Sequence, residues 1–399
     1  MKKRIVFLLT ALVLVTSIIV TGCAGASKAP SKGGVITIGL GTPLSGVAAG
    51  WGIPQLRATE MFFDKVNAEG GVTVQGKKYT FEVIGYDTKW DAAEGAIIAN
   101  RLAYEDGALI VSGCGGPAAV AAIPVYEEAG TVLNYDMPYA RRFPNANTPL
   151  LFAPFPRYGE AQSGYWPWLV AKFGIQKAAH VGANYEEGYF SEDMMNIYAP
   201  KAGVEVTAAE LVEFGTVDFT PTAMKLLAGD PGMVYIGGAP PDIAGGITRD
   251  LRALGYEGLM GYVYSPNLDV VRDIAGAEAA EGFMGMGTFG EPLSPQQISI
   301  RNEYIARYGQ AEWTTTVLLF YTAWETIPVA IEQAQSLEPS DIADALRLGM
   351  FETDAAGQVW YGGEEFYEGM GNQILYRMPV SQLQNGVAVL VDYITPGNY

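Results

Sequence analysis

Short apolar runs alternate with amphipathic segments along most of this 399-residue chain. Residues 35–40 are a β-branched run typical of a strand in a buried parallel sheet, and residues 53–68 space their apolar side chains as an amphipathic helix does. Strands separated by helices of this length form βαβ units, so the pattern predicts a parallel sheet with helices on both faces. The next predicted elements are strand 79–84, helix 92–104, strand 108–111, helix 118–129 and strand 131–133.

The same alternation restarts at residue 177, which predicts a second lobe of the same kind. Residues 152–157 are extended without helical spacing and residues 282–287 are similar, so we expect the chain to cross between the lobes there. The predicted fold class is α/β, with two doubly wound parallel-sheet lobes. The predicted strands are 177–181, 204–211, 233–236, 259–262, 373–376 and 387–391, and the helices are 191–202, 243–254 and 314–334. The predicted boundaries are 35–153 with 286–371 for lobe 1, and 154–285 with 372–399 for lobe 2.

The first residues indicate the compartment. A basic start, an apolar run over residues 5–20 and small residues before Cys23 are typical of a secretory signal, here 1–22. A cysteine at that point resembles the lipobox of bacterial lipoproteins, which implies that Cys23 is lipidated and that 23–34 is a tether. An ordinary signal peptide, or a retained anchor helix with Cys23 incidental, is the alternative. Because no later segment has about 20 consecutive apolar residues, we expect an extracytoplasmic protein that contacts the membrane through its lipid only.

Composition excludes several classes of function. Lys and Arg total 25 against 43 Asp and Glu, and a net charge of −18 makes nucleic acid an unsuitable partner. One histidine and two cysteines exclude a histidine-rich metal centre and a four-cysteine zinc site, and no cofactor is implied. An enzyme would need a nucleophile with a base, or paired carboxylates, whereas the spacing of Glu186, Glu187 and Asp218 is not that of a catalytic pair. His180 fits a packed strand residue better than a base. We therefore expect no enzymatic activity.

Several predicted strands are followed by glycine-rich or aromatic segments, at 41–46, 112–117 and 135–139. In open parallel sheets, ligands bind beyond the carboxyl ends of the strands. Glycine lets a backbone approach a ligand, and the free N–H groups at a following helix start hold a carboxylate. The sequence therefore predicts capture of a small ligand between the two lobes.

Five short motifs follow one another in order: 43–46 with Trp51 and Gly52, then 67–72, 86–88, 126–130 and 235–238. As an ordered set they resemble the solute-binding proteins of ABC importers of the branched-chain amino acid type, which have the type I periplasmic binding protein fold. The resemblance covers most of the chain after the signal. It implies lobes joined by three crossovers, closure on a small molecule, and delivery of that molecule by a monomer to an ABC permease in the membrane.

The ligand positions of that family carry over with several departures. At the end of the third strand, Cys114 stands where the family has a hydroxyl, while Gly115 and Gly116 still offer backbone N–H groups. Trp90 stands where some relatives place the disulfide partner of Cys114, so the resemblance implies a thiol. The remaining matches are bulky Met137 and Tyr139 at the next strand end, Tyr185 as the capping aromatic, Ala239 in place of an aromatic, and Val263 near the acid that takes the ligand's ammonium.

These departures bear on the ligand. Burying an ammonium without a counter-charge costs several kcal/mol, so the loss of the acid near Val263 argues against an α-amino acid. Asp136 could provide that counter-charge from the opposite lobe, although a bond to a loop backbone explains it better. The side chains expected to line the site are more aromatic and apolar than in the family: Trp51, Trp90, Met137, Tyr139, Tyr185, Tyr262 and Tyr264.

We therefore expect a small apolar or aromatic ligand, with any carboxylate held by the amides of Gly115 and Gly116. A branched-chain amino acid or amide, or a ligand sensor without transport, is the alternative. Any one of these aromatic residues is equally compatible with a place in the core.

Overall fold

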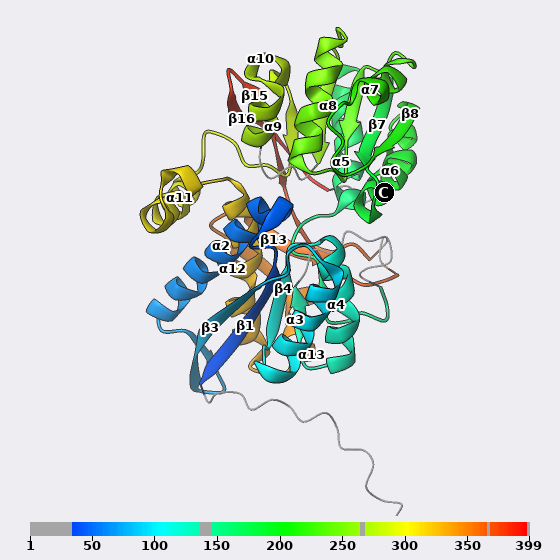
Figure 1. Cartoon of the computed structure of the whole chain (residues 1–399). Coiled ribbons are helices and arrows are strands. Elements are labelled where there is room, and N and C mark those ends of the chain that lie inside the picture. Colours follow the sequence, from blue (N-terminus) through cyan, green and yellow to red (C-terminus); the bar gives the residue numbers. More distant parts are fainter. Residues whose placement is uncertain (1–33, 136–144, 264–267, 365–367, 397–399) are drawn as a thin grey trace, which may run out of the picture.

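The computed structural model describes residues 34–135, 145–263, 268–364 and 368–396 and places them in two lobes, one above the other in Figure 1. The first lobe is built on a six-stranded sheet of order β2-β3-β1-β4-β5-β6, parallel except for the β2–β3 hairpin. Its central strand β1 is a buried β-branched segment, as its sequence predicts. The strands are β1 (Val35–Thr42), β2 (Val72–Val74), β3 (Lys77–Asp87), β4 (Ile110–Gly113), β5 (Leu133–Tyr135) and β6 (Leu151–Phe152).

Helices cover both faces of this sheet. On one face α2 and α12 pack around Phe63 and Trp324, whose rings meet edge to face at 5.2 Å. On the other face α3 and α4 enclose a smaller apolar cluster around Ile98 and Tyr126. The helical segments are η1 (Gly46–Ala48), α2 (Ala49–Ala68), α3 (Ala92–Asn100), the π-helical turn η2 (Arg101–Glu105), α4 (Gly116–Ala129), α12 (Thr316–Ala334) and α13 (Pro339–Leu348).

The second lobe is built on a seven-stranded sheet of order β16-β15-β11-β10-β9-β7-β8. Strands β7 to β11 pair in parallel, and the hairpin β15–β16 is added antiparallel at the β11 side. Its strands are β7 (Lys177–Ala183), β8 (Glu205–Val212), β9 (Met233–Ile236), β10 (Leu259–Val263), β11 (Met284–Met286), β15 (Met378–Gln384) and β16 (Val387–Ile394). Its helices are α5 (Tyr158–Phe173), α6 (Glu186–Lys201), α7 (Thr220–Leu227), α8 (Pro241–Ala253), α9 (Leu268–Ala275) and α10 (Ala277–Ala280).

The chain passes between the lobes three times: after β6, after β11 and after β14. Beside these passages lies an antiparallel three-stranded sheet made of β12 (Met350–Thr353), β13 (Gly357–Gly362) and β14 (Gln373–Tyr376). Helix α11 (Pro295–Tyr308) and the turn η3 (Gln310–Glu312) follow the second passage, and both are tied to α2. The ion pairs are Arg57–Glu312 at 2.7 Å and Arg307–Asp64 at 2.8 Å.

The fold class predicted from the sequence is confirmed, with two corrections to single segments. Residues 282–287, expected to cross between lobes, contain β11, which pairs on both sides within the seven-stranded sheet, so the passage follows that strand. Residues 373–376, expected in lobe 2, form β14 and pair with β13. Both errors arise because a three- or four-residue strand carries too few positions to show its pairing partner. The residue boundaries of the two lobes stay predictions.

Candidate ligand-binding site between the lobes

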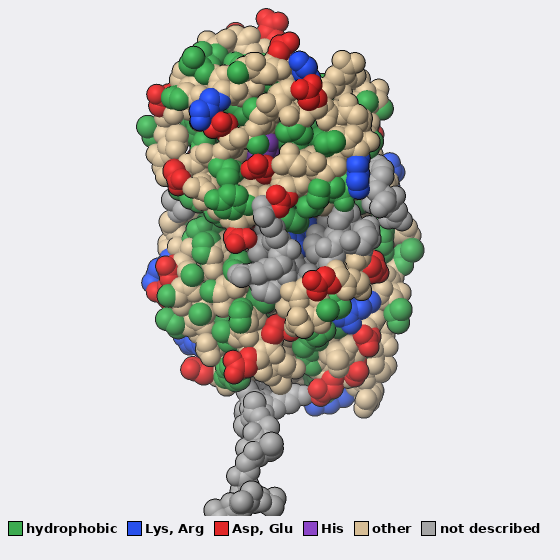
Figure 2. Space-filling model, turned by 90° about the vertical axis from the view of Figure 1, so that its right-hand side faces the viewer, with side chains coloured by type: hydrophobic (Ala, Val, Ile, Leu, Met, Phe, Trp, Pro, Cys, Tyr) green, Lys and Arg blue, Asp and Glu red, His purple; other side chains and the backbone are tan. Residues whose placement is uncertain are grey.

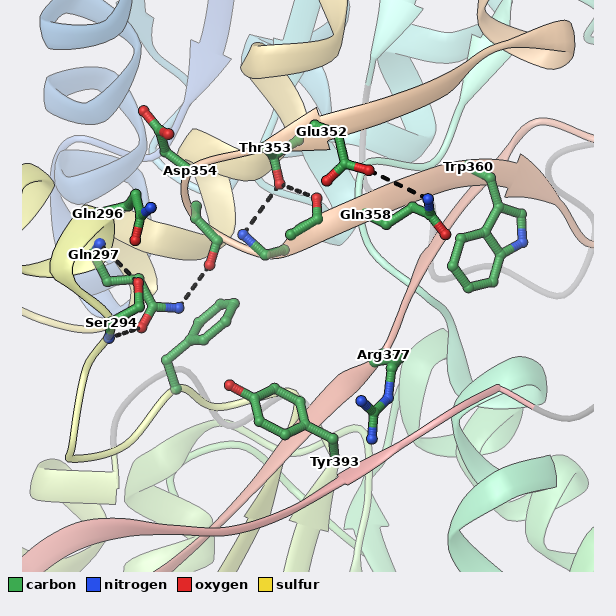
Figure 3. Close-up of a pocket in the computed structure, with 14 residues that line it drawn as sticks. Ser294, Gln296, Gln297, Glu352, Thr353, Asp354, Gln358, Trp360, Arg377 and Tyr393 are labelled. Carbon is green, nitrogen blue, oxygen red and sulfur yellow. Dashed lines mark hydrogen bonds between the residues drawn. The ribbon is translucent and has the colours of Figure 1, made fainter.

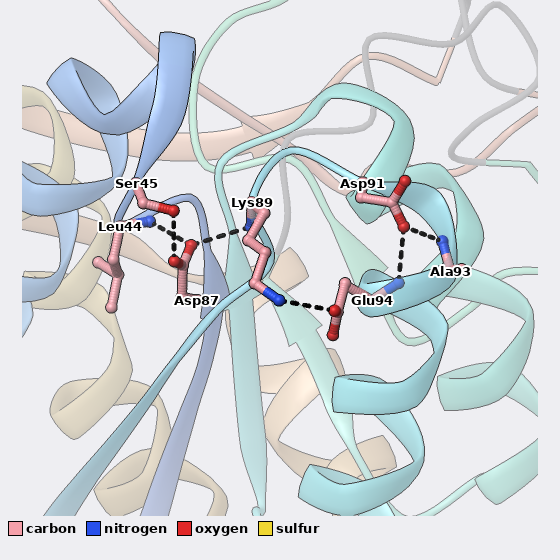
Figure 4. Close-up of polar contacts among 7 residues, drawn as sticks. All are labelled: Leu44, Ser45, Asp87, Lys89, Asp91, Ala93 and Glu94. Atoms are coloured by element: carbon pink, nitrogen blue, oxygen red, sulfur yellow. Dashed lines mark hydrogen bonds and ion pairs between the residues drawn. The ribbon is translucent and has the colours of Figure 1, made fainter.

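The loop that follows β1 is held in place by a single carboxylate at the end of β3 (Figure 4). Asp87 accepts hydrogen bonds from the Leu44 N–H at 2.8 Å, the Ser45 hydroxyl at 2.6 Å and the Lys89 N–H at 2.9 Å. Burial alone would raise the pKa of Asp87, but these hydrogen bonds outweigh it and lower the pKa below its usual value. An ionised Asp87 therefore fixes the loop in front of α2.

Two tryptophans that the sequence places far apart meet beside this loop. The rings of Trp51, at the start of α2, and Trp90, after β3, have centroids 5.6 Å apart and are tilted by 47°. Trp90 holds a left-handed backbone with φ of 62°, which is uncommon for a bulky residue. The Trp90 ring lies against Gly116, where a Cβ atom would come within 2.4 Å of it. Gly116 also has a positive φ of 67°, so both the close contact with Trp90 and the backbone conformation require glycine at this position.

The third strand of the sheet ends as the sequence predicts, in glycines that open a helix. Gly115 is the N-terminal cap of α4 and Gly116 its first residue, so their amides belong to the positive end of that helix. Cys114, just before them, is only 4% exposed, packs in the core and is in the thiol form. The thiol implied by the resemblance is thus confirmed.

The second lobe contributes ionisable side chains from the start of α6. Tyr185 caps this helix, its ring meets that of Phe214 at 5.2 Å, and its hydroxyl donates to the carboxylate of Glu187. The Gly116 N–H, from the first lobe, lies close enough to the same carboxylate to lower its pKa. Burial raises the pKa of Glu187 to about 7, against the lowering effects of the Tyr185 hydroxyl, the positive charge of Arg157 and the Gly116 N–H. We call Trp51, Trp90, Gly115, Gly116, Tyr185 and Glu187 the interlobe site.

Two further residues of the first passage between the lobes, Arg157 and Tyr158, contact elements of the second lobe. Arg157 is 1% exposed, with its guanidinium over the ring of Phe190 at 4.7 Å. The Tyr158 hydroxyl accepts a hydrogen bond from the Gly238 N–H at 2.9 Å, which ties the start of α5 to the end of β9. Sequence reasoning included Arg157 only as the end of an extended segment and missed its proximity to Glu187. An arginine within an otherwise apolar and aromatic segment was the available signal.

The other expected ligand contacts fall into two groups. Ala239 and Val263 are 1% and 0% exposed and pack in the apolar clusters of the second lobe and the main core, and their contact with a ligand stays a prediction. Asp136, Met137, Tyr139 and Tyr264 lie outside the described residues, as does Cys23. His180 is fully buried in β7, where burial lowers its pKa to about 3. It is therefore a neutral strand residue.

The arrangement offers binding groups rather than reactive ones. Within the described part of the chain, no group of three or more His, Cys, Asp or Glu side chains is placed to hold a metal ion. No helix is long and apolar enough to cross a membrane in the described ranges, 34–135, 145–263, 268–364 and 368–396. On the face shown in Figure 2, Lys and Arg are scattered among acidic side chains. Rings, main-chain amides and one carboxylate converge from two lobes instead.

Residues 35–386 match the family model described as periplasmic binding protein. The chain belongs to this family. The leucine-, isoleucine-, valine-, threonine- and alanine-binding protein of Pseudomonas aeruginosa is 24% identical over 333 residues, covering 83% of this chain and 87% of the relative. The Leu/Ile/Val-binding protein BraC3 of Rhizobium johnstonii is 23% identical over 341 residues, or 85% and 90% of the two chains. The predicted resemblance to branched-chain amino acid-type solute-binding proteins is confirmed.

Solved structures agree on the fold. The leucine-binding protein LivK of Thermotoga maritima has a TM-score of 0.75 at 18% identity, covering 90% of this chain and 99% of that one. A solute-binding protein of an ABC transporter from Rhodopseudomonas palustris, in complex with p-hydroxybenzoic acid, has a TM-score of 0.76 at 18% identity, with coverages of 91% and 98%. The relatives and the fold are those of extracytoplasmic binding proteins of transporters, not of enzymes.

Proposed function

We propose that this protein is the extracytoplasmic solute-binding lipoprotein of an ABC importer, which captures a small molecule between its lobes and delivers it to the permease. The observation that carries the proposal is the approach of the lobes at the interlobe site, where the Gly116 N–H of α4 lies close enough to the Glu187 carboxylate of α6 to lower its pKa. A ligand bound there touches both lobes, and its binding energy shifts the population towards the closed state.

We further propose that the ligand is a small apolar or aromatic compound. The Trp51–Trp90 pair and the Tyr185–Phe214 pair supply ring faces from the two lobes, and such walls hold planar rings and alkyl groups through stacking and burial of apolar area. A fold neighbour in complex with p-hydroxybenzoic acid is consistent with this class. A ligand carboxylate would use the Gly115 and Gly116 amides, and it would then displace Glu187 from Gly116.

An α-amino acid is the second candidate, and Glu187 favours it. Burial first, and the Glu187 carboxylate second, raise the pKa of Tyr262, which precedes Val263 on β10. The Glu187 carboxylate therefore lies near the strand end where the family's ammonium-binding acid falls, and it provides a counter-charge that Val263 lacks. The name of the Pseudomonas relative, a leucine-, isoleucine-, valine-, threonine- and alanine-binding protein, agrees with this candidate.

A thermal-shift comparison separates the two candidates, because a ligand that binds only the native state raises its apparent stability. The purified protein is heated with benzoate, 4-hydroxybenzoate, leucine or valine at equal concentration. We expect the aromatic acids to raise the melting midpoint more than leucine or valine do. The reverse order would favour the amino acid candidate, and no shift with any of the four would reject both.

The anchor and the partner are tested separately. We propose that Cys23 carries lipid and that the chain acts as a monomer. Metabolic labelling with a radioactive fatty acid should label the wild type and not Cys23→Ala, and light scattering should give the mass of one chain. Uptake of the identified ligand should require both this protein and the permease. Ligand binding without uptake would point to a sensor.

A further inference from the structure

A second candidate site lies beside the passages between the lobes (Figure 3). It is a pocket of about 630 Å³, and it shares no residue with the interlobe site. One wall is the β12–β13 hairpin, including Glu352 and Trp360, and a second is the start of α11 with Phe289. Arg377, on the passage from β14 to β15, and Tyr393, on β16, complete it. The pocket is thus walled by elements of both lobes.

Most polar groups of the hairpin wall already have partners within the protein. Gln297 donates to the Ala355 carbonyl at 2.7 Å, while its backbone N–H is capped by Ser294. Glu352 accepts a hydrogen bond from Gln358 at 3.2 Å. Asp354 is paired with Lys65 at 3.4 Å, and its backbone N–H donates to Glu325 on α12. The two carboxylates of this wall are therefore partly compensated, and the hairpin tip is fixed to the first lobe.

The charged group of Arg377 has different surroundings from the polar groups of the hairpin wall. The Arg377 guanidinium lies over the ring of Tyr393, 5.4 Å from the centroid. In the described residues no carboxylate comes within ion-pair distance of this guanidinium. The Tyr393 ring reaches into the pocket and is 37% exposed, and the Trp360 ring lies at the same end of the pocket as Arg377. Among the described residues, the Arg377 guanidinium is thus a cation without a carboxylate partner, held beside two aromatic rings at the pocket.

We propose that this pocket binds a small aromatic carboxylate, with the carboxylate on the Arg377 guanidinium and the ring against Tyr393 and Trp360. The planar guanidinium matches a carboxylate with two parallel hydrogen bonds, and the volume falls in the range of small-molecule sites. Because both lobes wall the pocket, an occupant favours one angle between them and is linked to capture at the interlobe site. The proposal does not depend on which ligand the interlobe site takes.

Benzoate is the probe, titrated by calorimetry into the purified full-length protein and two variants. Arg377→Met removes the charge and keeps the length of the side chain, whereas Tyr185→Ala alters the interlobe site alone. We expect a benzoate-binding event that Tyr185→Ala retains and Arg377→Met weakens by at least about tenfold. Any second event, lost in Tyr185→Ala and kept in Arg377→Met, belongs to the interlobe site, so the two proposals fail independently.

Two controls make the outcome decisive. Arg101 also lies over a tyrosine ring, Tyr86 at 4.2 Å, but it lies outside the pocket, so Arg101→Met should bind benzoate as the wild type does. Benzyl alcohol has the same ring without the charge and should bind at least tenfold more weakly than benzoate, on the order of one lost charged hydrogen bond. The proposal is overturned if benzoate shows no saturable binding at millimolar concentration, if Arg377→Met binds it unchanged, or if benzyl alcohol binds equally well.

Discussion

The two lobes contribute to the interlobe site in different ways. The first lobe supplies main-chain amides and two tryptophan rings, all set by backbone geometry: the loop bound by Asp87, the left-handed Trp90 and the glycines that open α4. The second lobe supplies side chains with ionisable groups, Tyr185 and Glu187, in a buried setting. The first-lobe half of the interlobe site is therefore fixed by backbone geometry. The second-lobe half depends on the protonation of ionisable side chains.

This difference has a consequence for pH. The Asp87 carboxylate that organises the first lobe has a lowered pKa and stays ionised at neutral pH. The Glu187 carboxylate has its pKa raised to about 7, so it exchanges a proton in the physiological range. The contribution of the first-lobe half to stability and ligand binding should therefore depend on sterics and hydrogen bonds. The contribution of the second-lobe half should depend on protonation. The following predictions test that division, beginning with the largest expected effect.

Gly116→Ala should have the largest effect, because it changes the fixed half directly. The new Cβ would lie 2.4 Å from the Trp90 ring at a backbone φ of 67°. We expect a loss of about 2–4 kcal/mol in the free energy of unfolding, from strain and overpacking together, and no measurable ligand binding. Gly174→Ala is the matched control, since Gly174 has the same φ and nothing within 4 Å of its Cβ position. Urea denaturation measures both, and equal losses would mean that the Trp90 contact does not matter.

Tyr185→Ala should weaken ligand binding without unfolding the protein. The substitution removes the ring that meets Phe214 and the hydroxyl that donates to Glu187, and Tyr185 packs at the edge of the second-lobe cluster rather than within it. We expect a loss of about 1–3 kcal/mol in binding, or roughly tenfold to a hundredfold in affinity, measured by calorimetry with the compound that stabilises best. Tyr104→Ala, at an exposed position of the first lobe, should bind normally. Unchanged affinity in Tyr185→Ala would remove α6 from the site.

Asp87→Ala should destabilise the protein by about 1–3 kcal/mol at pH 7, because three hydrogen bonds to a carboxylate are lost. Since its pKa is lowered in the folded state, this stability is present above the unfolded pKa near 4 and is lost as the pH falls. The difference in free energy of unfolding between wild type and Asp87→Ala should therefore become smaller as the pH falls below about 4. Asp91→Ala, which removes the cap of α3, should cost about 1 kcal/mol and leave ligand affinity unchanged. An intrinsic tryptophan emission spectrum unaltered in Asp87→Ala would contradict the role of Asp87 in positioning the loop beside Trp51 and Trp90.

The fixed half was largely predictable from the sequence, and the responsive half was not. Gly115 and Gly116 follow an apolar strand and open a helix, a pattern that local chemistry explains. Trp51 and Trp90 are expected near the site through the family resemblance, Trp51 as part of a family motif and Trp90 at the position of a relative's disulfide partner, and their rings do meet. The parallel arrangement of the central strands, with helices on both faces, follows from the alternation of short strands and helices.

Glu187 and Arg157 could not be assigned to the site in the same way. They lie 30 residues apart on α6 and on the cap of α5, and their electrostatic interaction depends on how the first passage folds back onto the second lobe. Helix α5 itself was missed, because its apolar residues surround Pro167 and two tryptophans without a clear period. Strands β11 and β14 were misplaced for a related reason: long-range pairing, not local pattern, sets their partners.

Glu187→Gln should have the smallest effect and the most specific one. With its pKa raised to about 7, Glu187 holds its proton in the folded state after the unfolded chain has lost it near pH 4.5. Its contribution to stability therefore falls as the pH rises from about 4.5 to 7, and glutamine removes that part of the slope. Because Glu187 is only partly buried and water screens part of its charge, we expect a difference of only about 1 kcal/mol, with the variant more stable relative to wild type at pH 8 than at pH 5. Glu186→Gln, next to it on the exposed side of α6, should follow the wild-type curve. Glu127 and Glu325 also have raised pKa values but are present in every variant, so they cancel in the comparison. Parallel curves of melting midpoint against pH for wild type and Glu187→Gln would show that Glu187 does not titrate in this range, and the contrast between the two halves would then be one of geometry alone.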